Sequence, residues 1–260
     1  MIVYSDSAKT YPCKVIGLTD AGEKAYYVEP EPGNYSDGKT ECFSRSGRPW
    51  LPNVFDDRLT CFIAGAPGAG KSYLATQLIK MFPEKYKILL FTALEENDGN
   101  FDCFKDRLYK IKMTPENLAR ITLSSIRERC EYPILLFDDI DKIRDKRVEK
   151  QIFALLEDAL ANGRGHKKHD GAGDIHTIVT SHALNDYKKT KYTLENSNYI
   201  ALFPGATTFR QLETMFNKLG LSPDLCRDVF ELGKNGFVRS IIIHKNVPMY
   251  LIGNQLIKLI

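Results

Sequence analysis

Cysteines are few and scattered in this chain of 260 residues. The six cysteines, at positions 13, 42, 61, 103, 130 and 226, form no Cys-x-x-Cys pair. A small domain held together by disulfides carries closely spaced cysteines, and a structural zinc site carries paired ones. We therefore expect free thiols and a reducing compartment.

Long apolar runs are also missing. No uninterrupted apolar segment approaches the length that spans a bilayer, and the first six residues lack the basic and apolar regions of a secretory signal. The sequence thus predicts no transmembrane segment. With 43% hydrophobic and 27% charged residues, the chain can bury a full core, either as one large domain or as a domain with a small appendage.

A strong overall charge is absent as well, since the formal net charge is only +3. The charge is unevenly distributed, because residues 142–191 contain eleven Lys or Arg against seven Asp or Glu, a larger surplus than that of the whole chain. Solvated surface is the default interpretation of any one basic cluster. The concentration leaves a DNA-facing surface open as the alternative.

One glycine-rich segment organises the sequence. Residues 65–72 read GAPGAGKS and fit the phosphate-binding pattern G-x-x-x-x-G-K-[S/T]. An apolar segment at 59–64 predicts the buried strand that should precede such a loop, and a helix ending before Pro83 is predicted after it. These flanking elements are the ones that the motif requires, so an accidental Gly-rich turn is disfavoured. We expect a nucleoside triphosphate to bind here.

The expected contacts with the nucleotide follow from the motif. Glycines let the backbone curl so that amides point at phosphate oxygens, and the N-terminus of the following helix adds its positive dipole. Lys71 should reach the β- and γ-phosphates, and the Ser72 hydroxyl should ligate Mg²⁺. The residues assigned to the nucleotide are Gly65, Ala66, Pro67, Gly68, Ala69, Gly70, Lys71, Ser72 and Tyr73.

A pair of carboxylates follows another apolar strand, predicted over 134–137. Parallel strands end at one edge of a sheet, so Asp138 should lie level with the glycine loop and hold Mg²⁺ together with Ser72. Asp139 would then lie near the γ-phosphate, where it could orient or deprotonate an attacking water. In the alternative interpretation Asp139 caps the next turn and Asp141 does the polarising.

Two candidate residues follow further along the chain. Arg164 follows the Asn162-Gly163 pair that ends a helix predicted over 147–160, where multimeric motors often present an arginine to a neighbour's γ-phosphate. Its alternative role is that of a helix-end cation facing the helix dipole. A strand predicted over 175–180 ends in Ser181 and His182, and either side chain could contact the γ-phosphate or merely cap the next turn.

The remaining segments predict further regular structure. We expect a β-hairpin within residues 14–28, strands at 87–94, 199–204, 236–243 and 248–252, and helices at 207–219 and 222–232. Residues 101–120 are expected to be helical and mixed, with Pro115 starting a fresh turn after Thr114. Trp50, the single tryptophan, is expected to pack as an apolar plug, with a docking surface as the less favoured alternative. The predicted fold is therefore α/β: a mostly parallel central sheet flanked by helices in residues 56–260, with a small β-rich appendage at 1–55.

The order of these motifs resembles the DNA-packaging ATPases of large eukaryotic DNA viruses, the poxvirus-type branch of the FtsK–HerA superfamily of P-loop NTPases. The likeness runs from about residue 59 to residue 251. It rests on the glycine loop, the Asp-Asp strand, the Gly-Arg-x-His segment at 163–166 and the strand-tip dipeptide at 181–182. One departure is His182, where the family usually carries Gln. Histidine can still donate a hydrogen bond to phosphate, and the role could then depend on pH.

The resemblance implies a RecA/FtsK-like P-loop fold and a motor function. It implies a homo-oligomeric ring of about five or six subunits that hydrolyses ATP with Mg²⁺ and drives double-stranded DNA, without reading its sequence, into a preformed capsid. Each site would combine Lys71, Ser72, Asp138 and Asp139 of one chain with an arginine of its neighbour. A viral capsid or packaging-vertex protein would be the partner, and the virion or a virus factory in the host cytoplasm would be the location.

Two other functions remain as alternatives. A P-loop nucleotide or small-molecule kinase should carry an arginine-rich lid, and no such lid is evident in the sequence. A nucleotide-dependent switch of the AAA+ type would usually need a C-terminal helical lid, whereas this chain is predicted to finish in strands.

Overall fold

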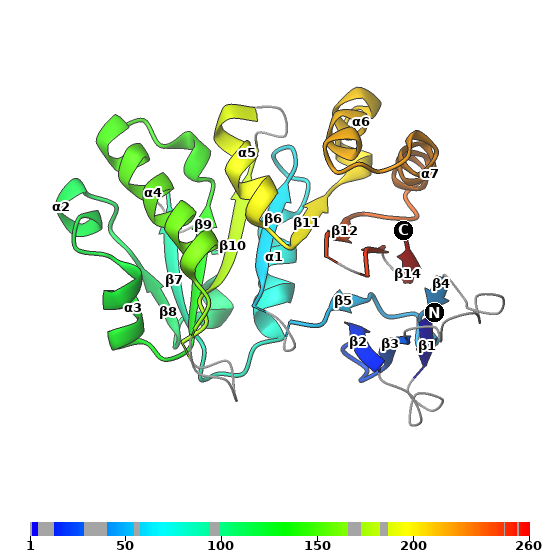
Figure 1. The fold of residues 1–260 in the computed structure, drawn as a ribbon, viewed down its shortest axis with the longest axis horizontal. Helices are drawn as coiled ribbons and strands as arrows, with labels where there is room; N and C mark the ends of the chain where they lie inside the picture. The colour runs from blue at the N-terminus through cyan, green and yellow to red at the C-terminus, as the bar shows by residue number, and fades with distance from the viewer. Residues whose placement is uncertain are drawn as a thin grey trace. The chain divides into compact units, whose positions relative to one another are not determined.

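The computed structural model describes residues 2–4, 13–28, 41–54, 58–93, 99–165, 173–182, 187–246, 248–253 and 255–260. The chain divides into two compact units, Arg58–Ile200 on the one hand and Met1–Asp57 with Ala201–Ile260 on the other (Figure 1). Strand β11 (Tyr199–Leu202) runs across the boundary between them. Each unit is described by itself.

The unit Arg58–Ile200 is built on a parallel sheet. Its strands are β6 (Thr60–Ala64), β7 (Lys87–Thr92), β8 (Leu108–Lys110), β9 (Pro133–Asp138) and β10 (His176–Ser181). They lie in the order β6-β10-β9-β7-β8, and each neighbouring pair is parallel. Every residue of β6, β9 and β10 is buried, as in strands covered on both faces. This burial accounts for the short apolar runs from which these strands were predicted.

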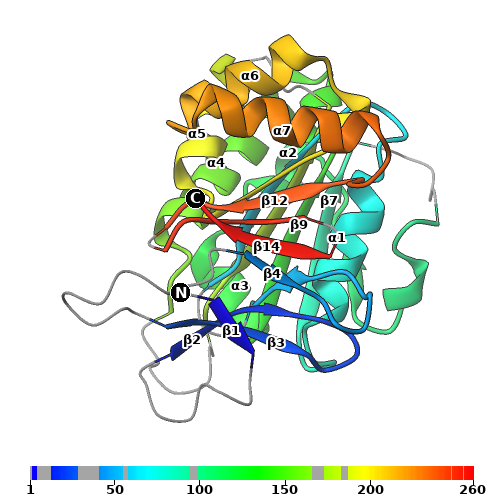
Figure 2. The same cartoon turned by 90° about the vertical axis from the view of Figure 1, so that its right-hand side faces the viewer.

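Helices cover both faces of this sheet. They are α1 (Lys71–Lys80), α2 (Pro115–Leu118), α3 (Leu123–Arg129), α4 (Lys146–Asn162) and α5 (Tyr187–Asn196), with short 3₁₀ turns η2 (Asp102–Phe104) and η3 (Ile140–Lys142). Helix α1 lies on one face, and α4 and α5 lie together on the other (Figure 2). The α/β P-loop fold with a mostly parallel sheet, as expected from the sequence, is therefore confirmed.

The longest of these helices shows why the sequence forms it. The carboxylate of Asp145 accepts hydrogen bonds from the amides of Arg147 and Val148, at 2.8 and 3.3 Å, and so caps the N-terminus of α4. Apolar residues recur at helical spacing along one face and are buried against the sheet. They are Val148, Ile152, Leu155, Leu156, Ala159 and Leu160. The predicted helix at 147–160 is confirmed.

The helical segment predicted over 101–120 is wrong for residues 105–114, whereas the fresh turn predicted at Pro115 after Thr114 is confirmed as α2, which Thr114 caps. The segment contains η2, strand β8 and α2, and β8 extends the sheet beside β7. The cause is tertiary: the Arg107 guanidinium donates to the carbonyls of Ile79, Phe82 and Pro83 at the end of α1. The residues after Arg107 are thereby placed along the open edge of β7, where strand pairing satisfies their backbone groups.

The other unit, Met1–Asp57 with Ala201–Ile260, is mainly antiparallel. One sheet has the order β1 (Ile2–Tyr4), β3 (Lys24–Val28), β2 (Cys13–Leu18) and β5 (Leu51–Pro52). A second set pairs β4 (Glu41–Phe43), β14 (Leu256–Leu259), β13 (Tyr250–Ile252) and β12 (Ile241–His244) in that order. Helices α6 (Phe209–Lys218) and α7 (Pro223–Lys234) and the 3₁₀ turn η4 (Pro204–Ala206) complete the unit.

Several predictions for this unit can be compared with the structure. The hairpin within residues 14–28 is formed by β2 and β3, and Trp50 is buried, so both predictions are confirmed. The strand predicted at 236–243 begins only at Ile241. Strand β4 pairs with β14, so residues 41–43 share a sheet with the C-terminal segment. The division into an appendage at 1–55 and an ATPase domain at 56–260 stays a prediction.

None of the helices in the described part of the chain combines the length and apolar character that a bilayer crossing requires.

Candidate nucleotide-binding site

The glycine-rich loop connects β6 to α1 and presents unpaired amides. Gly68 and Gly70 have φ angles of 75° and 107°, a region that glycine enters without the Cβ penalty. No side chain caps α1, and no residue in the described segments accepts a hydrogen bond from the amides of Gly68, Gly70, Lys71 or Ser72. Amide donors at the positive end of a helix suit an anionic phosphate group.

Lys71 lies inside this loop and is 6% exposed. Its Nζ donates to the carbonyls of Gly65 and Ala66, at 3.1 and 3.3 Å, and lies 3.1 Å from Nδ1 of His182. Burial lowers the pKa of Lys71, while the negative charge of Asp139 acts in the opposite direction. The residues present therefore fit a triphosphate, whose oxygens could replace the two carbonyls as acceptors for this ammonium.

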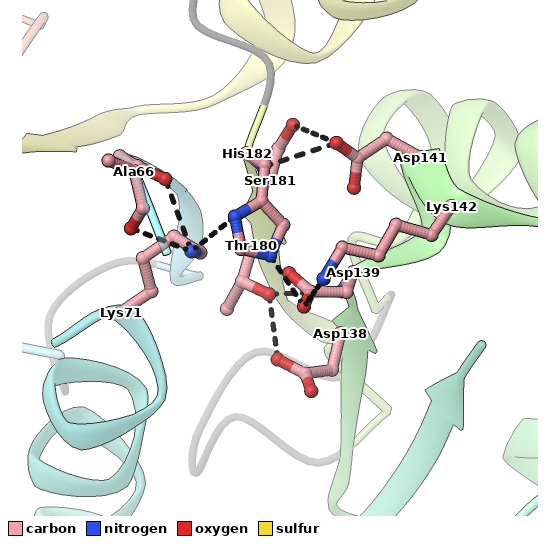
Figure 3. Close-up of polar contacts among 10 residues, drawn as sticks. Ala66, Lys71, Asp138, Asp139, Asp141, Lys142, Thr180, Ser181 and His182 are labelled. Carbon is pink, nitrogen blue, oxygen red and sulfur yellow. Dashed lines mark hydrogen bonds and ion pairs between the residues drawn. The ribbon is translucent and has the colours of Figure 1, made fainter. Parts of the chain in front are cut away.

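His182 joins the loop to the carboxylate pair (Figure 3). Its Nε2 lies 2.7 Å from Oδ2 of Asp139, and its backbone amide donates to Oδ2 of Asp141 at 3.1 Å. An ammonium can only donate, so Nδ1 of His182 accepts from Lys71 and Nε2 donates to Asp139. The Lys71 ammonium and the Asp139 carboxylate are thus separated by the width of one imidazole ring.

Asp139 is held as a carboxylate. Its Oδ2 accepts from Lys142 Nζ at 3.0 Å as well as from His182. Burial opposes ionisation of Asp139, but the hydrogen bonds from His182 and Lys142 outweigh it and lower the pKa of Asp139. Its other oxygen, Oδ1, is buried and has no hydrogen-bond partner among the described residues. That oxygen is a potential acceptor for a water proton.

The backbone at the end of β9 turns the two carboxylates in different directions. Asp139 has φ 50° and ψ 35°, and among the described residues it is the one non-glycine residue with positive φ. The Thr180 hydroxyl supports this turn, since it accepts from the Asp139 amide at 3.1 Å and donates to Oδ1 of Asp138 at 2.7 Å. Asp138 is therefore held toward Thr180 and Asp139 toward His182. A residue in a sparsely populated backbone region next to a charged cluster is typical of a functional site.

The alternative interpretation of Asp139 is not supported by these contacts. The turn η3 starts at Asp139, but no side-chain hydrogen bond caps it. Asp141 instead accepts from the Ser181 hydroxyl at 3.3 Å and from the His182 amide, which ties η3 to the tip of β10. The structure therefore brings Lys71, Asp139 and His182 together, while their catalytic roles stay predictions.

A magnesium site of the expected kind is compatible with these residues. No group of three or more His, Cys, Asp or Glu that could hold a metal occurs in the part of the chain that the structure describes. Mg²⁺ bound to nucleotides usually takes only one or two protein oxygens and completes its shell with phosphate and water. Ser72 and Asp138 would supply such a pair.

One predicted residue, Arg164, lies away from this cluster. The carbonyl of Gly163, next to Arg164, accepts from the amide of Ile175 at 2.8 Å, directly before β10 begins. Arg164 thus lies at the edge where the strands start, opposite the edge that carries Asp139 in the same chain. Tyr73 follows Ser72 on α1 and is 61% exposed.

Sequence reasoning missed Thr180 and Lys142 as members of the site. Thr180 was counted only as part of a strand, and Lys142 only as part of a basic cluster. One signal was available: Lys142 lies three residues after Asp139, the spacing of a helical ion pair. The bond from Thr180 to Asp138 depends on the pairing of two strands and has no local signature.

Comparison with known proteins decides the family. Residues 61–193, just over half of the chain, match the model of the ATPase family associated with various cellular activities (AAA). The chain belongs to the AAA family. It is therefore a nucleotide-dependent ATPase of the P-loop type. The sequence disfavours an AAA+-type switch because it predicts strands at the C-terminal end of the chain. These strands are present as β12, β13 and β14. The match to the AAA family shows that they do not exclude AAA membership.

Two known proteins are similar to this AAA protein. Over 248 residues it is 29% identical to "Uncharacterized protein V3" of the Sputnik virophage, which covers 92% of this chain and 90% of that protein. It is also similar to the cytoplasmic domain of the Thermomonospora curvata Type VII secretion ATPase EccC, with a TM-score of 0.46 and 12% identity. That similarity covers 93% of this chain and only 28% of the EccC chain.

Proposed function

We propose that this AAA protein is an ATP-hydrolysing double-stranded DNA translocase that packages a viral genome into a capsid, in the poxvirus-type branch of the FtsK–HerA superfamily. MgATP supplies the phosphoryl group whose hydrolysis drives the movement. The loop at 65–73 binds the phosphates, with Lys71 as the charged donor. Ser72 and Asp138 hold Mg²⁺, Asp139 orients or deprotonates the attacking water, and His182 contacts the γ-phosphate.

The observation that carries this proposal is the contact chain from Lys71 through His182 to Asp139. It connects the residue that would hold the γ-phosphate with the carboxylate that would accept a proton from water. The carboxylate of Asp139 is ionised at neutral pH, and because its pKa is lowered it is a weaker base than an ordinary aspartate, which suits it to orient the attacking water. A change in the position of Lys71 or of Asp139 would therefore alter the hydrogen bonds of the other through the His182 ring.

The position of Arg164 supports a site shared between copies. Since Arg164 lies at the opposite edge of the sheet from Asp139 of its own chain, its guanidinium suits the site of another copy. Head-to-tail interfaces of this kind close into rings, here of about five or six subunits. An arginine supplied by a neighbour stabilises the charge that develops on the transferred phosphoryl group.

Basic residues adjoin the carboxylate pair and support binding to DNA. Lys142 forms the ion pair with Asp139, and Arg144, Lys146, Arg147 and Lys150 follow it as exposed cations. Phosphates of a duplex would bind such a surface without reading the sequence. Through Lys142, binding there would act on Asp139 and couple the grip on DNA to hydrolysis. The basic segment at 166–169, which would also face DNA, falls outside the described residues.

The test is the rate of ATP hydrolysis by the oligomeric protein against added duplex DNA. We expect stimulation that weakens as the salt concentration rises, since phosphate contacts release counterions. Arg144→Gln combined with Arg147→Gln should reduce this stimulation, whereas the matched control Arg120→Gln with Arg129→Gln should not. Turnover that is indifferent to duplex DNA at low salt would refute the translocase.

AAA membership supports a second candidate, a nucleotide-dependent switch that acts on another protein. Such a switch would hydrolyse ATP at a rate that a protein partner changes and duplex DNA does not. A P-loop kinase would reveal itself in the same assay by transfer of labelled phosphate to a small acceptor. If the protein is instead the proposed packaging translocase, its partner would be a capsid or packaging-vertex protein. It would then act in the virion or in a virus factory in the host cytoplasm.

A further inference from the structure

The C-terminal end of α4 is held by arginine side chains. Arg58 donates from Nη1 to the carbonyl of Ala159 at 2.9 Å and from Nη2 to the carbonyl of Leu160 at 2.5 Å. Gly163, at which the helix ends, has φ −69° and so does not form the left-handed turn that commonly closes helices. The last carbonyls of a helix have no partner within it, and here a guanidinium takes that role.

A second arginine, Arg127 of α3, fixes the backbone around Arg164. Its Nη2 donates to the carbonyls of Asn162 and Arg164, at 2.9 and 3.0 Å, and its Nε donates to the carbonyl of Gly173 at 3.1 Å. One side chain therefore connects the segment that leaves α4 with the segment that returns to β10. The planar fork of a guanidinium allows this, whereas an ammonium has no such fixed geometry.

Hydrogen bonds of the backbone amides hold the same two segments, 163–165 and 173–175, in place. The Gly165 amide donates to Oδ1 of Asp174 at 2.6 Å, and the Ile175 amide donates to the Gly163 carbonyl at 2.8 Å. The Gly173 amide donates to the Glu131 carbonyl at 2.8 Å. The backbone is thus pinned immediately before and immediately after Arg164.

Gly163 makes the arrangement possible. A Cβ at this position would collide with Nη1 of Arg58 and with the carbonyl of Ala159. The glycine that precedes Arg164 is therefore explained by the close approach of Arg58 to the end of the helix. Its function is to let α4 end in a fixed geometry.

The Arg164 side chain differs from its surroundings. It is exposed, and within the described segments its guanidinium has no hydrogen-bond or ion-pair partner. A pinned backbone that carries an exposed cation, without an ion-pair partner among the described residues, is suited to act on something outside its own chain. We propose that Arg127 and Asp174 are positioning residues that hold Arg164 where it reaches the triphosphate of a neighbouring copy. This inference rests on the proposed function of Arg164.

The first measurement is the turnover of the full-length Arg127→Gln protein. Because a misplacement of about 1 Å costs on the order of 100-fold in rate, we expect kcat to fall roughly 10- to 100-fold with an unchanged KM for ATP. Arg127→Lys keeps the charge but not the fork, and it should be equally slow. Arg129→Gln, an exposed position on the same helix, is the matched control and should behave as wild type.

Mixed oligomers separate positioning from a general structural role. Lys71→Ala chains lack a working loop but retain Arg164, so combining them with Arg127→Gln chains should restore turnover above that of either variant alone. Combining Arg127→Gln with Arg164→Ala should restore nothing, since both chains present a defective arginine. Asp174→Ala, which frees the Gly165 amide, should give the same pattern of complementation.

The outcomes distinguish this inference from the function on which it rests. If Arg164→Ala turns over as wild type, the arginine supplied by a neighbour is wrong and the positioning role falls with it. If Arg164→Ala is slow but Arg127→Gln and Asp174→Ala are not, the positioning role alone is wrong. Failure of both Arg127→Gln and Asp174→Ala to fold or assemble, or equal turnover in the two mixtures, would also overturn it.

Discussion

Acidification is expected to destabilise this protein through His176. This residue starts β10 and is 4% exposed, and its Nδ1 accepts from the amide of Leu59 at 3.0 Å. The rings of Phe82 and Tyr86 pack edge-on against it, with centroids at 4.7 and 5.5 Å. Burial, and to a lesser extent repulsion from Arg58, lower the pKa of His176 from 6.5 to about 4.

The size of the effect follows from the difference between the folded and unfolded chains. In the unfolded chain His176 takes up a proton as the pH falls through 6.5, whereas in the fold it stays neutral until the pH nears about 4. The unfolded state therefore binds more protons in this window, and the free energy of unfolding must fall as the pH falls. The loss attributable to His176 is about 2 kcal/mol between about pH 7.5 and 5, and about 3 kcal/mol by about pH 4.

Urea unfolding across this pH range measures the loss directly. His176→Asn removes the titratable ring and leaves an amide oxygen that can accept from the Leu59 amide. The variant therefore separates the effect of protonating residue 176 from the effect of losing its hydrogen bond. It should be less stable than wild type near neutral pH, because the ring contacts with Phe82 and Tyr86 are lost. On acidification to about pH 5, however, it should lose about 2 kcal/mol less than wild type. Equal losses in the two proteins would refute the reasoning.

Four further predictions concern the candidate site. Lys71→Ala should abolish binding of a fluorescent ATP analogue, because the buried ammonium is the charged donor of the loop; retained binding would contradict its role. Asp139→Asn keeps a residue that tolerates the left-handed backbone, so it should bind ATP but hydrolyse it roughly 10²- to 10⁴-fold more slowly, a difference that single-turnover assays would detect. His182→Gln can still donate a hydrogen bond and should retain more single-turnover activity than His182→Ala, so equal rates would count against phosphate contact. Arg164→Ala should spare ATP binding and reduce turnover, and mixed oligomers with Lys71→Ala should recover activity if the arginine acts on a neighbour.

The parallel sheet and its glycine loop were predictable because their signals are local. Strands that are covered on both faces consist of short apolar runs, which can be recognised in the sequence. Strands β6, β7, β9 and β10 all lie where such runs predict them. The caps are local as well: Thr208 and Ser222 accept from the amides three residues on and open α6 and α7 where the sequence placed them. The meeting of Lys71 with Asp139 followed from one rule, that parallel strands end at the same edge.

What escaped prediction depends on contacts between distant segments. Residues 108–110 became a strand because Arg107 is anchored to the end of α1 and the edge of β7 was open. The hydrogen bond from Arg127 to the carbonyl of Arg164 joins residues 37 positions apart in the sequence, and no periodic pattern predicts it. The hydrogen bond from the Thr180 hydroxyl to the Asp138 carboxylate likewise depends on the pairing of β10 with β9. Side chains that bind backbone carbonyls leave no pattern at their own position, which explains why such residues were missed.

The strands that carry the site also restrict where the chain can change in length. Ala64 is aligned with Ser181, Val179 with Phe137, and Thr92 with Asp138. One extra amino acid within any of these strands would advance the residues beyond it by about 3.3 Å and turn them to the other side of the sheet. Insertions and deletions are therefore expected to be tolerated in the connections, while any that falls inside β6, β9 or β10 would separate the glycine loop from its acids.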